Sequence, residues 1–313
     1  MKIICLGLLF LVSSFPAFLA QSNEQALRLR QGDVFHFGIV DEKCRFDARF
    51  KVLDGENTST GEEGLFLLLE SLVSDDGKAV AFRKEKDEEH NSYTGSDAKA
   101  WCARFFEDHF SALEKEYILP TFCSDEPYSV PAAFGFGGKT PSVDFAAEEN
   151  ILDGDHVFLL SAKEASSERY GLIDSQSRLA SYEGVTASYW LRSPHDRSNF
   201  PNDVGIVFYN GWLMDFIQHN DNVFGVSPIY MRPALNLRKI PSEELCIIGE
   251  NQYCLKEDKE RFPLPSEAPS YKQRDPLPML LVIGIASLLI LIGTPIVIVI
   301  LVKRHRKKKR KGN

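Results

Sequence analysis

The sequence predicts an α+β domain with two main helices and an antiparallel C-terminal meander, followed by one transmembrane helix. Three observations predict this fold class. The alternating run over 33–40, rich in aromatic and β-branched residues, indicates a strand, and two further strands over 49–54 and 64–73 follow it across turn-like stretches. Apolar residues at helical spacing indicate a helix over 96–117. The 24 residues of 279–302 carry no charge, and at about 1.5 Å per residue they can cross a hydrocarbon core of roughly 30 Å.

Both predicted helices have recognisable N-termini. The first begins at Ser96 or Asp97, residue types that cap helices. Its apolar face consists of Ala98, Trp101, Cys102, Phe105, His109, Phe110 and Leu113. The second is expected at Ser161, directly after a buried strand over 156–160, because Glu164 stands three residues later and completes a capping box.

The C-terminal third of the domain is expected to consist of short strands. Pro194 ends the strand YWLRSP, since proline cannot donate a backbone hydrogen bond to a neighbouring strand. Asn210-Gly211 lies between two apolar runs and predicts a tight hairpin. Two longer loops, 195–203 and 217–229, separate these strands, and a last strand contains MRPALNL.

The ends of the chain predict its cellular location. An apolar N-terminus with small residues near Ala20 indicates a secretory signal peptide, and a Pro-rich, charged segment indicates a stalk. Eight Lys or Arg residues follow the transmembrane helix, which places this tail in the cytoplasm by the positive-inside rule. The expected order is signal peptide 1–22, extracellular domain 23–255, stalk 256–278, transmembrane helix 279–302 and cytoplasmic tail 303–313.

The exported part is strongly acidic. The chain has a net charge of −8, and leaving out the eight cationic residues of 303–313 and Lys2 gives −17 for the remainder. Such a domain repels nucleic acid and anionic lipid head groups. Nucleic acid is therefore excluded as a partner, and the membrane is expected to be contacted only through the transmembrane helix.

Five cysteines lie outside the signal peptide, so one is left over if two disulfides form. Cys246 and Cys254 are the most local pair, on either side of a turn-like Gly-Glu-Asn, and Cys102 with Cys123 is a second pairing. Sequence alone does not choose among the fifteen arrangements of two disulfides. No CxxC and no Cys/His cluster at zinc spacing occurs, so no metal site is predicted.

Arg192 and Arg232 each interrupt an otherwise apolar strand. A buried arginine needs partners, because an unpaired buried charge costs several kcal/mol, and its five donors suit a carboxylate or several carbonyls. Asp155 and Glu164 are the candidate partners. We predict that both arginines are structural clamps, with Trp190 in the core beside them; an anion-binding site is the alternative.

The order of these segments resembles a known family. FG, KVLD, LFLLLESLV, a Trp-containing helix, DHVFLLSAKEA, YWLRSP, an NG hairpin and RPALNL together look like a bacterial domain family of unknown function found in surface and secreted proteins. The resemblance covers residues 32–238. The ending of the domain also resembles the C-type-lectin-like fold of formylglycine-generating enzymes, which implies that fold here.

The residues favour a binding module over an enzyme. A formylglycine-generating enzyme would, by resemblance, need a cysteine pair in the C-terminal region of the domain, and none lies between Cys123 and Cys246. The motifs GxSxG, HExxH and GxGxxG and the phosphate-binding P-loop are all missing from the sequence. Isolated acids such as Asp215 and Glu183 are expected on a solvated face. A membrane-anchored enzyme, or an accessory domain of one, is the alternative.

The two long loops are the predicted recognition surface, because polar loops with aromatics on a rigid scaffold often carry binding. An extracellular glycan or protein is the expected ligand, bound by Asp196, Asn202, Asp203, Asn220, Asp221 and Phe224. No cofactor is expected. Calcium is a weaker alternative, because Asn202-Asp203 and Asn220-Asp221 match only in part the motifs of calcium-dependent lectins.

Overall fold

The computed structural model describes residues 27–41, 46–75, 77–84, 91–131, 142–146, 151–195, 202–217 and 228–261. The chain divides into a compact unit, 1–266, and a second unit, 267–313. The predicted signal peptide, transmembrane helix and cytoplasmic tail all lie outside the described residues. Within the described ranges, no helix is both long and apolar enough to cross a membrane.

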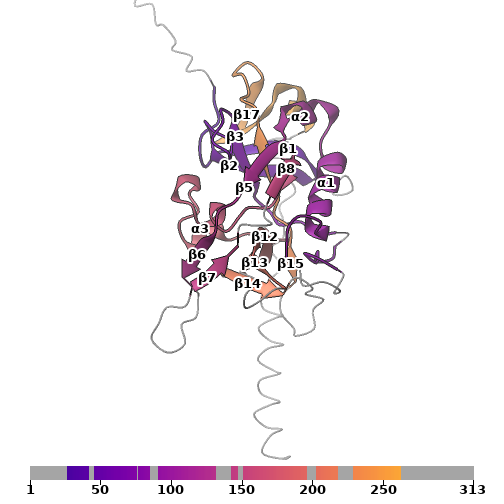
Figure 1. The fold of residues 1–313 in the computed structure, drawn as a ribbon. Coiled ribbons are helices and arrows are strands. Elements are labelled where there is room, and N and C mark those ends of the chain that lie inside the picture. Colours follow the sequence, from indigo (N-terminus) through magenta and orange to yellow (C-terminus); the bar gives the residue numbers. More distant parts are fainter. Residues whose placement is uncertain are drawn as a thin grey trace, which may run out of the picture. The chain divides into compact units, whose positions relative to one another are not determined.

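The larger sheet joins strands from both ends of the domain (Figure 1). Its order is β17-β18-β1-β2-β3-β16-β4, with β9 also paired to β16. The parallel pair is β1 with β18, and the other pairs are antiparallel. Its strands are β1 (Val34–Asp41), β2 (Phe46–Asp54), β3 (Leu65–Leu69), β4 (Ile118–Leu119), β9 (Val157–Phe158), β16 (Ala234–Leu237), β17 (Leu245–Gly249) and β18 (Gln252–Leu255).

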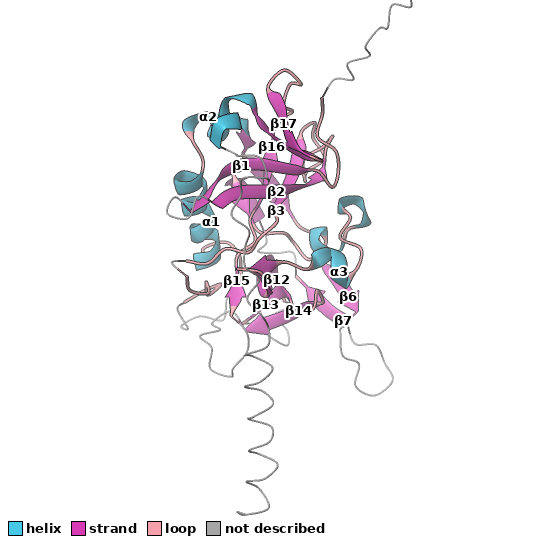
Figure 2. Ribbon diagram, turned by 180° about the vertical axis from the view of Figure 1, so that it is seen from behind, coloured by secondary structure: helices cyan, strands magenta, loops and turns pink. Residues whose placement is uncertain are grey.

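A smaller four-stranded sheet has the order β14-β13-β12-β15 (Figure 2). Its strands are β12 (Ser188–Pro194), β13 (Asp203–Val207), β14 (Leu213–Ile217) and β15 (Ile229–Tyr230). Every residue of β12 is buried, including the polar Ser188, Arg192 and Ser193. Three two-stranded ribbons complete the strands: β5 (Thr121–Ser124) with β8 (Ile151–Asp155), β6 (Tyr128–Pro131) with β7 (Ser142–Phe145), and β10 (Ser181–Tyr182) with β11 (Val185–Thr186).

The segment predicted as one helix over 96–117 forms two helices. Ser96 caps α1 (Asp97–His109), and Ser111 caps α2 (Ala112–Tyr117) through a capping box with Glu114. The first helix ends at His109 because Phe110 adopts an extended conformation, and the second helix begins after Ser111. The described residues also contain α3 (Ser175–Arg178) and the 3-10 helices η1 (Glu164–Ser166), η2 (Glu168–Tyr170) and η3 (Lys256–Arg261).

The contact between α2 and the large sheet depends on a glycine. Gly38 in β1 has φ +85, and a Cβ there would lie 2.7 Å from the ring of Phe110. Its backbone N–H donates to Glu114 Oε1 at 2.7 Å. Glu114 is fully buried, and its other oxygen accepts from the backbone of Ser111 at 2.7 Å. One carboxylate therefore closes the cap of α2 and holds that cap against β1.

The fold-class prediction of an α+β, C-type-lectin-like domain with two main helices is wrong, and the transmembrane helix predicted with it lies outside the described residues. Strands dominate the described residues, and no described helix can span a membrane. The helix expected at Ser161 is only the short turns η1 and η2. The predicted C-terminal meander also contains a parallel pair, β12 with β15. Residues 256–261 of the predicted stalk form η3.

Candidate functional site

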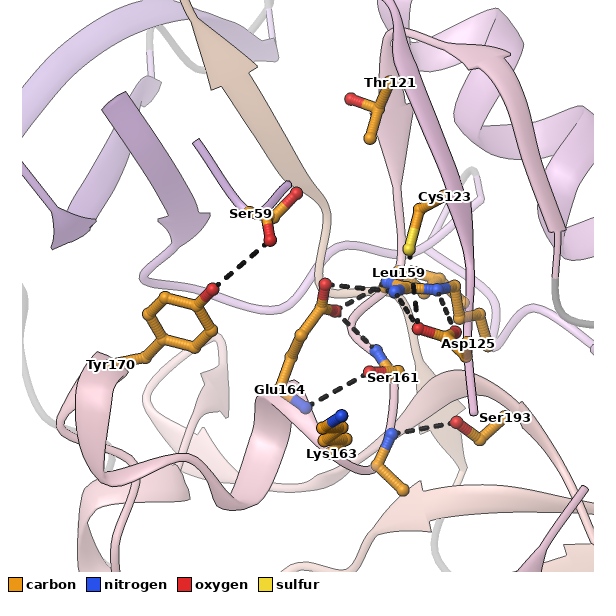
Figure 3. A network of polar contacts seen from close by, with 12 residues as sticks. Ser59, Thr121, Cys123, Asp125, Leu159, Ser161, Lys163, Glu164, Tyr170 and Ser193 are labelled. Atoms are coloured by element: carbon orange, nitrogen blue, oxygen red, sulfur yellow. Dashed lines mark hydrogen bonds and ion pairs between the residues drawn. The ribbon is translucent and has the colours of Figure 1, made fainter. Parts of the chain in front are cut away.

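Arg192 lies in the middle of β12 and is completely buried. Its Nε and Nη2 donate to the two carboxylate oxygens of Asp125, both at 2.9 Å. Nη1 and Nη2 donate to Glu164 at 2.6 and 3.0 Å. Nη1 also donates to the carbonyl of Leu159 at 2.6 Å. Five N–H donors thus meet five acceptors from the protein itself (Figure 3).

The electrostatics of this cluster keep Arg192 charged. Burial alone would lower the pKa of the Arg192 guanidinium, but the carboxylates of Glu164 and Asp125 hold that pKa well above its usual value. The guanidinium carbon also lies 5.5 Å from the ring centre of Phe158. Because the protein uses every N–H of the side chain, this geometry favours the structural clamp over the alternative of an anion site.

Glu164 is positioned by the local sequence that predicted a capping box. Its backbone N–H donates to Ser161 Oγ at 3.1 Å, and its Oε2 accepts from the Ser161 N–H at 2.8 Å (Figure 3). The same carboxylate therefore orders the turn that follows β9 and binds Arg192. Asp125, which follows β5, is a partner that the sequence does not predict, since nothing in the surrounding SDEP sequence distinguishes it from a solvated acid.

Arg232 is also buried but has a different set of partners. Its Nε donates to the carbonyl of Leu69 at 2.9 Å, and Nη1 donates to the Arg178 carbonyl and the Tyr189 hydroxyl at 3.1 and 3.0 Å. Among the described residues no carboxylate forms an ion pair with Arg232. The side chain therefore links β3, α3 and β12 through neutral acceptors.

Asp155 and Trp190 occupy other parts of the domain's interior. The carboxylate of Asp155, at the end of β8, pairs with Lys99 of α1 at 2.8 Å, and no contact with either buried arginine is found among the described residues. Trp190 is 1 % exposed and donates its indole N–H to the carbonyl of Val80 at 2.7 Å. The indole is satisfied within the protein, as expected for a core residue.

The four cysteines predicted as disulfide candidates are free thiols in the structure. Cys246 and Cys254 lie directly opposite each other on β17 and β18, with their Sγ atoms 2.9 Å apart. Cys102 is buried in α1, where burial raises the pKa of its thiol to about 12. Cys123 lies beside Asp125, and no contact joins it to Cys102 among the described residues. The geometry thus brings the first predicted pair together and leaves the second apart.

The two predicted recognition loops start from the same end of the small sheet. Loop 195–203 joins β12 to β13, and loop 217–229 follows β14. Asp203 is directly opposite Ile217 in the β13–β14 register. Of the six predicted ligand residues, Asn202 and Asp203 lie at this end and are partly buried. Asp196, Asn220, Asp221 and Phe224 lie outside the described residues.

This end of the sheet carries a cluster of titratable side chains, which we call the acid end: Asp203, Asp215 and His195. The carboxyl groups of Asp203 and Asp215 are hydrogen-bonding neighbours. Burial and the charge of Asp215 raise the pKa of Asp203 to about 6, against the opposing effect of His195. His195 Nε2 lies 3.6 Å from Asp215 Oδ2, and the His195 side chain is 9 % exposed.

Neighbouring residues hold the acid end in place. Asn91, which is fully buried, donates its amide to the carbonyls of His195 and Asp203 at 3.0 and 2.7 Å. Asp144 of β7 approaches His195, and its hydrogen bonds from Ser129 and Ser142 lower the pKa of the Asp144 carboxyl, with a smaller contribution from His195. The β12 and β13 ends are therefore fixed by a buried amide rather than by the carboxyls alone.

The chemistry of the acid end is acid-base and hydrogen-bonding chemistry. Two adjacent carboxyls, one of them with a raised pKa, can hold one proton between them, so they offer both a donor and an acceptor. Among the described residues, no group of three or more His, Cys, Asp or Glu side chains has a geometry that could hold a metal ion. The sequence predicts Asp203 as a ligand residue but places Asp215 on a solvated face.

Comparison with known proteins gives one match. The profile of a family described as Domain of unknown function (DUF6273) matches residues 63–239. The chain belongs to the DUF6273 family. No curated protein and no solved structure matches the chain. The expected membership of a family of unknown function is therefore confirmed, and the expected likeness to the lectin-like fold has no support from solved structures.

The DUF6273 match begins at residue 63, later than the predicted start at 32, and ends after β16. It includes Arg192, Arg232 and the acid end. It leaves out β1, β2, β17 and β18, which extend the large sheet beyond β3. The DUF6273 segment of this chain therefore shares its large sheet with strands contributed from both flanks.

Proposed function

We propose that this protein is a surface-exposed binding module, anchored by a single C-terminal membrane segment, that recognises an extracellular glycan or protein with its acid end. One observation carries the proposal: both polar loops start beside the same partly buried cluster of Asp203, Asp215 and His195. A rigid sheet that presents polar groups next to two loops is the usual arrangement of a recognition surface.

The partial burial of Asp203 and Asp215 supports a polar ligand. Each carboxyl is held near a second titratable group, so a ligand that reaches this end meets both donors and acceptors. Sugar hydroxyls and the polar side chains of a protein surface have matching chemistry. Arg192 and Arg232 lie outside this role, because their donors bond to the protein itself.

The proposed location rests on the sequence of the two ends of the chain. Residues 279–302 carry no charge and are followed by eight Lys or Arg, which favours an outside domain and a cytoplasmic tail. Protease added to intact cells is expected to remove an epitope inserted between residues 22 and 27 and to spare one placed after residue 313. Cleavage of the C-terminal epitope on intact cells would contradict this orientation.

Binding is tested with the purified full chain on arrays of glycans and extracellular proteins. A ligand found in this way is then offered to a variant in which 196–201 and 218–227 are replaced by short Gly/Ser segments. We expect this variant to remain folded, because stability changes slowly with loop length, and to lose at least about ten-fold in affinity, roughly 1.4 kcal/mol.

The matched point variants are Asp215→Asn at the acid end and Asp153→Asn on the exposed face of β8. Both remove one carboxylate charge, but only Asp215 adjoins the two loops. Weaker binding by Asp215→Asn with unchanged binding by Asp153→Asn supports recognition at the acid end. Full affinity in the folded loop variant would assign the ligand to another surface.

A second candidate function is acid-base catalysis at the same place. The favouring observation is the pair of adjacent carboxyls, with the pKa of Asp203 raised to about 6, together with a histidine. Hydrolysis of an arrayed glycan or peptide by the wild-type chain, abolished in both Asp203→Asn and Asp215→Asn, would support this candidate over simple binding.

A further inference from the structure

We propose that the acid end is a pH-dependent contact between β13 and β14, which we call the latch. It stabilises this strand pair when Asp203 and Asp215 share a proton and strains it when both carboxyls are ionised. The latch is a property of the folded domain and requires no ligand. It therefore stands or falls independently of the proposed binding function.

The strand register places the two carboxyls together. Asp203 lies opposite Ile217, and Gly205 lies opposite Asp215. Asp203 and Asp215 are thus diagonal neighbours on one face of the β13–β14 pair, because residues two apart in a strand share a face. Gly205 has no side chain on this face, and the ring of Phe145 and the Ser193 carbonyl pack where its Cβ would stand, at 2.9 and 3.1 Å.

The backbone around the pair is fixed. The amide of Asn91 bonds the carbonyls of both His195 and Asp203, and the backbone N–H of His195 donates to the Asp203 carbonyl at 3.0 Å. Asp203 therefore cannot move away from Asp215 without breaking the buried hydrogen bonds that tie the start of β13 to Asn91 and His195. The repulsion has to be carried by β14, which is the edge strand of the sheet.

Charged groups from three other strands face Asp203 or its neighbours. Asp215 on β14 disfavours the ionised form of Asp203, and His195 after β12 favours it. Asp144 on β7 approaches His195 from the other side. His195 lies 3.6 Å from Asp215, beyond hydrogen-bonding distance. Its effect on Asp203 is smaller than that of burial and Asp215, so the balance favours the protonated carboxyl.

The direction of the pH effect follows from linkage. The pKa of Asp203 is raised from 3.8 to about 6 on folding. The folded protein then binds more protons than the unfolded chain between these values, so this contribution to stability is fully present below about pH 4 and is lost as the pH rises through about 6. In the neutral range the ionised pair pushes on β14, next to the start of loop 217–229.

The test compares thermal unfolding of the full chain in detergent with that of Asp203→Asn, from about pH 4.5 to about pH 7.5. Asparagine keeps the shape of the protonated acid and donates to Asp215 without titrating. We expect the Tm of Asp203→Asn minus that of wild type to rise with pH, by about 3 °C across the range. Asp153→Asn is the control, and its difference from wild type should stay constant.

Asp215→Asn provides a second, independent variant, because it removes the repelling charge and leaves Asp203 in place. Its difference from wild type should also rise with pH. Amide hydrogen exchange should report the strain locally, with faster exchange in 203–217 of the wild type at neutral pH than at acid pH and no such change in Asp203→Asn. Differences that do not vary with pH in both variants would overturn the latch.

Discussion

Replacing Arg192 with alanine is expected to destabilise the domain by about 3–5 kcal/mol, the typical cost of breaking a buried ion pair from one side. The loss is large because Asp125 and Glu164 would keep their charges without the guanidinium that holds them. Urea unfolding of the full chain in detergent, followed by circular dichroism, measures the change. Protonation of the two carboxylates removes the uncompensated charge, so the deficit should shrink in acid.

Arg169 supplies the matched control for this experiment. It also forms an arginine–carboxylate pair, with Asp54 at 2.8 Å, but its side chain is 48 % exposed. Arg169→Ala should therefore cost less than about 1 kcal/mol. A cost for Arg192→Ala as small as that of the control would show that the buried cluster does not clamp β12. A triple variant, Arg192→Met with Asp125→Asn and Glu164→Gln, should recover part of the stability.

Replacing Arg232 with alanine is expected to cost about 3 kcal/mol for a different reason. The substitution leaves the carbonyls of Leu69 and Arg178 and the hydroxyl of Tyr189 without this donor, and it opens space at a side chain that is 4 % exposed. Because these acceptors are neutral, the deficit should be nearly the same at acid and neutral pH.

The comparison of the two arginine variants separates their roles. A deficit for Arg232→Ala that shrinks in acid as much as that of Arg192→Ala would contradict the assignment of neutral partners. Arg232→Lys is an informative second variant, since a lysine keeps the charge but lacks the planar guanidinium that donates to several acceptors at once. It should recover less than half of the stability lost in Arg232→Ala.

Local sequence signals predicted the beginnings of elements better than their lengths. Ser96 caps α1 as expected, and the alternation over 33–40 corresponds to β1. The capping box at Ser161 and Glu164 forms its two hydrogen bonds, yet only short 3-10 turns follow it. The Glu164 carboxylate also binds Arg192, and Gly171 ends the second turn in a left-handed conformation. Tertiary partners thus overrode the helical pattern.

The register of β13 against β14 decides whether Asp203 and Asp215 lie on the same face, and a shift of one residue would separate them. A two-residue turn at Asn210-Gly211 would pair Tyr209 with Trp212 and place Asp203 and Asp215 on opposite faces. In the structure Phe208 pairs with Trp212 through a longer turn, with Gly211 at φ +82. Asp215 consequently faces Asp203. Hydrophobic alternation alone does not distinguish these two turns, and no sequence motif marks Asn91 as the residue that ties the ends together.

The parallel pairing of β1 with β18 has a consequence for how the domain is made. Val34 pairs with Gln252, and Leu65 of β3 pairs with Leu237, so strands synthesised early must wait for the last part of the domain before the large sheet closes. Contacts between residues so distant in sequence form slowly, because the entropy of closing the intervening loop is lost before the contacts stabilise the chain. During synthesis, the apolar edges of β1 and β3 are open to mispairing with other chains until residues 234–255 have been made.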